Sequence, residues 1–300
     1  MFRATEVFMD TLVAIDIVEA GDERQSSEAA ARAFGWFREV EARCSRFDAA
    51  SELMQLSGTV GQPVVVSPLL YQALEFALTV AAASSGAFDP TVGAAMQSAG
   101  FDRNYLTGLR VARGAGGVEA ASYRDVRLEP RSRRVTLLRP LTLDLGAVAK
   151  GLAVDLAGRE LQNFEGFAVN AGGDILTAGT NASGEPWRIG IRDPRDPMKL
   201  IDAVRISGGA VCTSGDYERH QADGFGHHVL DPKTGRSSAE VVSVTAIAAS
   251  AMVADALGTA AFVLGPQAGI AFLDSHGVDG MIVDASMGIH TTGRFARHRK

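Results

Sequence analysis

Cysteine is scarce in this chain, and positive charge is not in excess. Only Cys44 and Cys212 occur among the 300 residues, too few for a disulfide scaffold or a cysteine-rich metal site. A single bridge is one alternative, but we expect two buried free thiols. The 29 Lys and Arg residues are outnumbered by 35 Asp and Glu residues, for a formal net charge of −6. Nucleic-acid binders normally carry a basic surface, so this balance disfavours that class.

Long apolar runs are also missing. No stretch approaches the ~20 consecutive apolar residues of a membrane span. The first residues carry Asp10 and Asp16 within their apolar stretch and lack the apolar core and cleavage site of a signal peptide. We therefore expect a cytoplasmic protein for the sequence as given, with no lipid-anchor motif. An exported form stays open if the sequence has been trimmed.

The composition is that of a globular chain with a sizeable core, since 46% of the residues are hydrophobic and 21% are charged. No internal repeat or low-complexity linker divides it. Helical and strand patterns alternate in mixed order, which predicts one α+β unit of mixed or antiparallel sheets packed with helices. Periodicity and capping residues predict helices over 26–44 (capped by Ser26 or Ser27), 68–86, 148–164 and 250–264. They predict strands over 5–19, 135–145, 167–169, 175–177, 187–191, 203–206, 241–247 and 281–283, and a loop over 108–117.

Several widespread catalytic motifs are absent, namely G-x-x-x-x-G-K-[ST], H-E-x-x-H and G-x-S-x-G. What stands out instead is a set of polar clusters at predicted turns. These are GAFDPTVG (86–93), DLGAVAKG (144–151), NAGGD (170–174), TSGDY (213–217), HHVLDP (227–232) and SAMVAD (250–255), with Thr259 beyond the last.

Asp255 and Thr259 are four residues apart on a predicted helix and therefore share one face. A carboxylate and a hydroxyl side by side offer hard oxygen ligands, which suit Mg²⁺ better than zinc. The structural alternative is that Asp255 only interacts with the helix dipole near the N-terminus. Spacing alone favours that alternative.

Lys150 lies at a predicted helix start, where free backbone N–H groups and an ammonium would bind phosphate; a solvated lysine is an equally good interpretation. Gly172 and Gly173 would let a backbone approach a ligand, although a plain hairpin turn is the simpler interpretation. His227 and His228 are adjacent, so in a strand they would point to opposite faces, and one could act as a base. A histidine whose ring is hydrogen-bonded within the fold and has no catalytic role is commoner than a catalytic base. The residues alone thus indicate, with low specificity, a Mg²⁺-dependent enzyme acting on a phosphate-containing ligand.

The ordered combination of clusters is far more specific than any member, and it resembles the FAD:protein FMN transferase family (ApbE-like flavin transferases). The resemblance covers roughly residues 5–285 and implies one ApbE-like domain over 1–300. It rests on SRFDAASEL (45–53), AFDPTVG (87–93), DLGAVAKG (144–151), NAGGD (170–174), TSGDYER (213–219), HVLDPKTG (228–235) and SVTAIAASAMVADALGTAAFVLG (243–265).

The resemblance implies an enzyme that cleaves FAD at its pyrophosphate, releases AMP and esterifies FMN onto a threonine or serine of an acceptor flavoprotein. Its implied partners are FAD and that acceptor, with Mg²⁺ as cofactor. It implies His228 as general base and Asp255 as a catalytic metal ligand, beside the Ala147 carbonyl and the Thr259 hydroxyl. The implied FAD contacts are Met9, Phe47, Ala87, Phe88, Asp89, Asp144, Lys150 and Leu230.

Two stretches depart from the family pattern. Met9-Asp10-Thr11 stands where the family usually has Met-Gly-Thr, and aspartate lacks the backbone freedom of glycine. Residues 94–101 read AAMQSAGF, without the tryptophan that the family commonly has there. Two alternatives remain open: a Mg²⁺-dependent FAD pyrophosphatase giving FMN and AMP, and a non-catalytic FAD-binding module.

Overall fold

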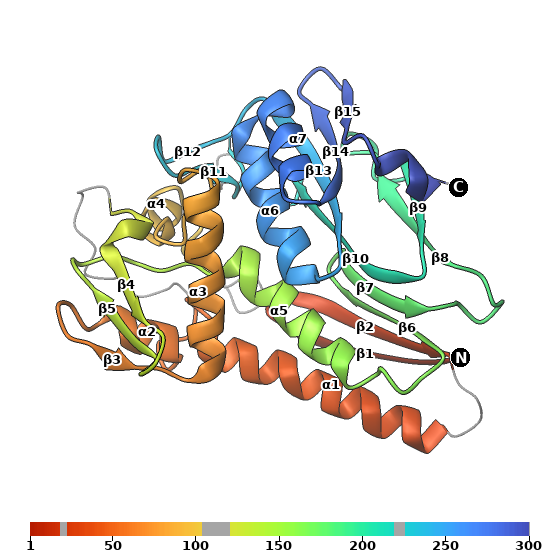
Figure 1. Ribbon diagram of the computed structural model, residues 1–300, viewed down its shortest axis with the longest axis horizontal. Coiled ribbons are helices and arrows are strands. Elements are labelled where there is room, and N and C mark those ends of the chain that lie inside the picture. Colours follow the sequence, from red (N-terminus) through yellow and green to blue (C-terminus); the bar gives the residue numbers. More distant parts are fainter. Residues whose placement is uncertain (19–22, 104–120, 219–225, 300) are drawn as a thin grey trace.

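An eight-stranded antiparallel sheet forms the centre of the protein (Figure 1). The computed structural model describes residues 1–18, 23–103, 121–218 and 226–299. The strands lie in the order β1-β2-β6-β7-β10-β13-β14-β15. Their bounds are β1 Phe2–Phe8, β2 Thr11–Val18, β6 Gly166–Ala171, β7 Asp174–Gly179, β10 Gly208–Gly215, β13 Val241–Ala248, β14 Asp279–Asp284 and β15 Ile289–Thr291. With helices packed on these antiparallel strands, the predicted α+β class is confirmed.

Burial along the strands follows their place in the sheet. In β2, Val13, Ile15 and Ile17 alternate with partly exposed residues and are fully buried, as expected for a strand with one covered face. In β13, every residue except the last is buried, because this strand is covered on both faces.

Helices cover one face of the sheet, and a hairpin covers part of the other (Figure 1). The helices are α1 Glu23–Cys44, α5 Gly146–Arg159, α6 Ala251–Leu264 and α7 Pro266–Ser275. The hairpin consists of β8 Trp187–Arg192 and β9 Leu200–Ile206. The 3₁₀ helix η2 Phe295–Arg299 packs against β9. A separate hydrophobic cluster that includes Phe295 lies under this hairpin. None of the helices in the described parts of the chain is long and apolar enough to cross a membrane.

A smaller group of elements stands beside the helical layer. It contains a three-stranded sheet in the order β3-β5-β4. Its elements are α2 Glu52–Ser57, β3 Val64–Val65, α3 Pro68–Ala83, α4 Gly93–Ser98, η1 Tyr123–Asp125, β4 Val126–Glu129 and β5 Arg134–Leu137. A two-stranded ribbon, β11 Leu230–Asp231 and β12 Arg236–Ser237, completes the fold.

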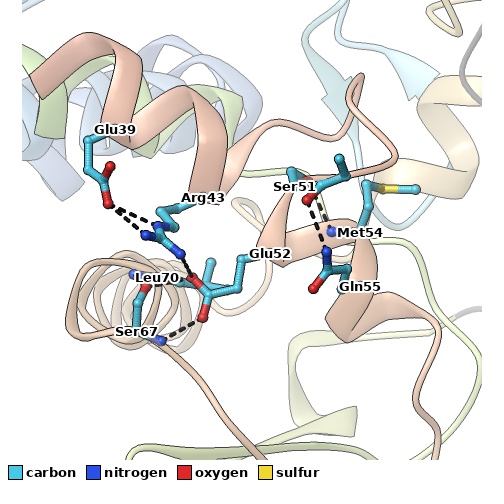
Figure 2. Close-up of polar contacts among 9 residues, drawn as sticks. Glu39, Arg43, Ser51, Glu52, Met54, Gln55, Ser67 and Leu70 are labelled. Atoms are coloured by element: carbon cyan, nitrogen blue, oxygen red, sulfur yellow. Dashed lines mark hydrogen bonds and ion pairs between the residues drawn. The ribbon is translucent and has the colours of Figure 1, made fainter. Parts of the chain in front are cut away.

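A polar network ties α1, α2 and α3 together (Figure 2). The Glu52 carboxylate accepts hydrogen bonds from the Ser67 N–H and hydroxyl, each at 2.6 Å, and lies 3.8 Å from Arg43. Ser51 caps α2 by accepting from the Met54 N–H at 3.1 Å. These contacts fix both ends of the segment that follows α1, residues 45–51.

The N-terminal strand prediction over 5–19 is wrong in one respect, because two strands occupy this region. Met9 and Asp10 adopt left-handed backbone conformations, with φ of 50° and 61°, and turn the chain between β1 and β2. Two consecutive positive φ values are typical of the tight hairpin turns that favour glycine. Aspartate tolerates this conformation better than most residues, so Asp10 does turn the chain where the family has glycine.

Other predicted boundaries also move. Ser26 and Ser27 lie inside α1 rather than capping it, and the second helix ends at Ala83, before Gly86. The strand predicted over 135–145 ends at Leu137, since Pro140 follows closely and has no N–H for a ladder. The helix predicted over 148–164 is α5, two residues earlier at its start and five shorter at its end. Residue 19 and the predicted loop over 108–117 lie outside the described residues.

Both cysteines are buried and free, as predicted.

Candidate active site

One cavity of about 450 Å³ gathers the residues that the sequence singled out. It opens where the β1–β2 turn, the segment after α1, the start of α5, the end of β10, the β11 region and α6 meet. Twelve sequence-predicted residues line it: Met9, Phe47, Ala87, Phe88, Asp89, Asp144, Ala147, Lys150, His228, Leu230, Asp255 and Thr259. The volume lies within the range of about 300–1,000 Å³ that is usual for small-molecule sites.

Helix α6 presents Asp255 and Thr259 to the cavity one turn apart. Ser250 caps this helix, as predicted, by accepting from the Val253 N–H. Asp255 is 7% exposed, and no hydrogen-bond donor among the described residues satisfies its buried Oδ2. Burial raises the pKa of Asp255, and the nearby Lys150 ammonium opposes that shift. The Thr259 hydroxyl lies 3.4 Å from the hydroxyl of Ser214 on β10.

These groups fit a hard divalent cation. An unsatisfied buried carboxylate oxygen with a hydroxyl one helical turn away is a suitable donor set for Mg²⁺. Within the described parts of the chain, no group of three or more His, Cys, Asp and Glu side chains lies close enough to hold a metal ion. Mg²⁺ commonly binds through one or two carboxylates and takes its remaining ligands from water and substrate phosphates. The donors present suit that mode and not an all-protein cage.

Lys150 does not project freely into the cavity. Its Nζ contacts Oδ2 of Asp174 and lies 3.8 Å from Oδ2 of Asp255. Asp174 is 1% exposed at the start of β7. It follows the Gly172-Gly173 turn, where φ is +61° and +101°. The simple hairpin interpretation of that turn is therefore correct, and Gly172 also lines the cavity.

The start of α5 differs from the expectation of free N–H groups. The Gly146 N–H donates to Oδ1 of Asp144 at 2.7 Å. The N–H groups of Val148 and Ala149 donate to the Leu145 carbonyl. A phosphate here would therefore depend more on side-chain and metal charges than on an open helix terminus.

Asp155 on α5 holds the N-terminus of α6. Its carboxylate accepts from the Ser250 hydroxyl at 2.6 Å and from the N–H groups of Ala251 at 2.7 Å and Met252 at 3.0 Å. At Gly151 an added Cβ would lie 2.6 Å from the Met252 backbone, so the two helices are in close contact. The sequence reasoning missed Asp155, whose only local signal is a carboxylate inside an apolar helix.

Arg46 is a second residue that the sequence reasoning missed, although it lies within the quoted stretch SRFDAASEL. It lines the cavity and is 5% exposed. Its Nε lies 2.5 Å from Oδ2 of Asp144, its Nη2 donates to the Phe101 carbonyl at 2.7 Å, and its guanidinium lies 4.2 Å from the centre of the Phe47 ring. Arg46 therefore orients two of the predicted FAD contacts.

Asp89 shapes the loop that carries Ala87 and Phe88. Its Oδ1 accepts from the N–H and hydroxyl of Thr91, at 2.9 and 2.7 Å. Its Oδ2 accepts from the Tyr123 N–H at 2.9 Å. Both carboxylate oxygens are thus used to fix this part of the cavity wall.

The adjacent histidines are placed differently. His227 is buried, with Nε2 2.7 Å from the Ser238 carbonyl and its ring edge-on to Phe262. His228 is half-buried and lines the cavity. The two side chains separate as predicted, although these residues precede β11 and do not lie in a strand. Of the two, His228 is the one that lines the cavity.

Comparison with known proteins identifies the family of this chain. The ApbE family model matches residues 9–282. A FAD:protein FMN transferase from Treponema pallidum is 32% identical over 306 residues, covering 94% of this chain and 84% of that protein. Another, from Vibrio cholerae, is 30% identical over 259 residues, covering 82% and 76%. The crystal structure of the ApbE protein from Thermotoga maritima superposes with a TM-score of 0.89 at 31% identity, covering 100% and 99% of the two chains. The family model alone spans most of the chain, and the chain therefore belongs to the ApbE family.

Proposed function

We propose that this protein transfers FMN from FAD to a threonine or serine hydroxyl of an acceptor flavoprotein, in a Mg²⁺-dependent reaction that releases AMP. The observation that carries the proposal is the convergence of residues from distant parts of the chain on one cavity. There, no described residue donates a hydrogen bond to the buried Oδ2 of Asp255. The names of the related transferases support the transfer of FMN from FAD to a protein.

The charges around the cavity explain why a cation is needed. Among the described residues, its wall carries six acidic side chains (Asp10, Glu41, Asp89, Asp144, Glu218, Asp255) and two basic ones (Arg46, Lys150). Arg46 is bound to Asp144, and Lys150 to Asp174. A diphosphate entering this acidic wall would be repelled unless a further positive charge came with it.

The roles of the chain's residues follow from their positions. Asp255, Thr259 and the Ala147 carbonyl would hold Mg²⁺, which neutralises phosphate charge in phosphoryl transfer. Lys150 supplies a second cation beside the phosphates. His228 faces the same space and would accept the proton of the attacking hydroxyl, directly or through water.

The test is a reaction of the protein with FAD, Mg²⁺ and candidate acceptor domains, with mass spectrometry of the acceptor. We expect an FMN adduct on threonine or serine. Asp255→Asn should lower Mg²⁺-dependent transfer at least about 100-fold, as loss of several kcal/mol of charge stabilisation implies. Asp274→Asn, an exposed carboxylate on α7, is the matched control and should retain full activity.

Omitting the acceptor separates the remaining alternatives. Rapid release of FMN and AMP from FAD and Mg²⁺ alone would identify a pyrophosphatase. Tight FAD binding with neither product nor adduct would identify a binding module. His228→Ala should slow transfer more than it weakens FAD binding, and equal losses would contradict its role as base.

A further inference from the structure

Lys150 forms ion pairs with two buried carboxylates, a close one with Asp174 and a longer one with Asp255. Its Nζ rests against Asp174 and stays 3.8 Å from Oδ2 of Asp255. That separation is longer than the roughly 2.7–2.9 Å of a charge-assisted hydrogen bond. The side chains of Asp174 and Asp255 are 2% and 9% exposed, so each needs a positive partner to compensate its burial.

Asp174 is not placed to touch a ligand. It is 1% exposed and is not part of the cavity wall formed by the described residues. Its position is set by the backbone, because it pairs with Ala171 across the β6–β7 hairpin. The Asp174 carboxylate contacts the Lys150 ammonium, and Asp174 can therefore act on the site only through Lys150.

We propose that Asp174 is a positioning residue that holds the Lys150 ammonium away from Asp255 and so keeps the Asp255 carboxylate available to a divalent cation. The proposal rests on the Mg²⁺-dependent function above and deepens it. Without Asp174, the ammonium would move onto the other buried carboxylate within reach. An ammonium hydrogen-bonded to Asp255 would then compete with the divalent cation for the same oxygen.

The expected effect follows from the distances. Moving the ammonium from 3.8 Å to about 2.8 Å from the Asp255 oxygen strengthens their attraction enough, at an effective dielectric constant of about 20, to weaken cation binding about tenfold. Neutralising Lys150 removes the competitor, so the same change at Asp174 should then matter little.

The experiment is a double-mutant cycle read by direct metal binding, with Mn²⁺ titrated into the full chain and followed by electron paramagnetic resonance. The variants are Asp174→Asn, Lys150→Met, the double variant K150M/D174N, and Asp255→Asn as the reference for loss of the site. We expect Asp174→Asn to weaken Mn²⁺ binding about tenfold in the native background and less than about twofold in the Lys150→Met background. Recovery of binding in the double variant also shows that the chain still folds without the Asp174 charge.

The outcomes separate this proposal from the one on which it rests. If Asp174→Asn costs the same factor in both backgrounds, Asp174 acts only as a distant charge or a structural residue, and the positioning role is overturned while the metal site stands. If Asp255→Asn binds Mn²⁺ as well as the native protein does, the metal site itself is misplaced, and both proposals fall.

Discussion

The clamp between α5 and α6 offers the sharpest test of how this fold assembles its site. Replacing Asp155 with alanine removes the acceptor for three donors, the Ser250 hydroxyl and the N–H groups of Ala251 and Met252. Asp155 is not the N-cap itself, but losing an acceptor at a helix N-terminus is comparable with loss of an N-cap, which costs about 0.5–2 kcal/mol. Leaving buried donors without partners costs about 1–3 kcal/mol. The two contributions overlap, so we expect Asp155→Ala to lower the free energy of unfolding by about 3 kcal/mol.

The measurement is urea-induced unfolding followed by circular dichroism, with Asp155→Asn as an intermediate case because its amide oxygen can still accept. The matched control is Asp193→Ala. Asp193 also accepts backbone N–H groups, from Arg195 and Asp196, but in the loop between β8 and β9, away from α6. Its loss should cost about 1 kcal/mol or less. Equal losses for Asp155→Ala and Asp193→Ala would refute the idea that the carboxylate joins the two helices.

The remaining predictions concern the thiols, the C-terminal region and the first turn. Burial raises the pKa of Cys44 to about 12 and that of Cys212 well above its usual value, so neither thiol should react with Ellman's reagent at pH 8 until the protein is unfolded; fast reaction of the native protein would contradict this. Burial raises the pKa of Asp279, but the His298 hydrogen bond and two arginines outweigh it and lower that pKa overall. The pKa of an aspartate in the unfolded chain is about 3.9. A carboxyl group whose pKa is lower than this in the folded protein stabilises the fold at pH values above about 3.9, and the contribution is lost as the pH falls through the folded-state pKa. The free energy of unfolding should therefore drop with acidification below about pH 4, and Asp279→Asn should show a shallower drop. At the β1–β2 turn, Asp10→Val should lower the free energy of unfolding by about 1–2 kcal/mol relative to Asp10→Gly, because a β-branched residue resists positive φ; equal stabilities would argue that the turn rearranges.

Short local patterns in the sequence indicated part of the candidate site, and the resemblance to the family supplied most of its other residues. The i, i+4 spacing of Asp255 and Thr259 put them on one helix face, and Ser250 capped that helix as expected. The side chains of the adjacent histidines separate, and His228 is the one that lines the cavity. Local chemistry of this kind is set by backbone geometry within a few residues, which a single sequence carries.

Boundaries and long-range partners were decided only by the tertiary structure. Asp10 turns the chain with a positive φ that its residue type only tolerates, and the hairpin it forms is stabilised by the rest of the sheet. Asp155, Arg46 and Asp174 act on groups far away in the chain, on α6, on Asp144 and on Lys150. Sequence periodicity does not predict such contacts. A buried charged group needs a partner that is close in space, and that partner can lie anywhere in the sequence.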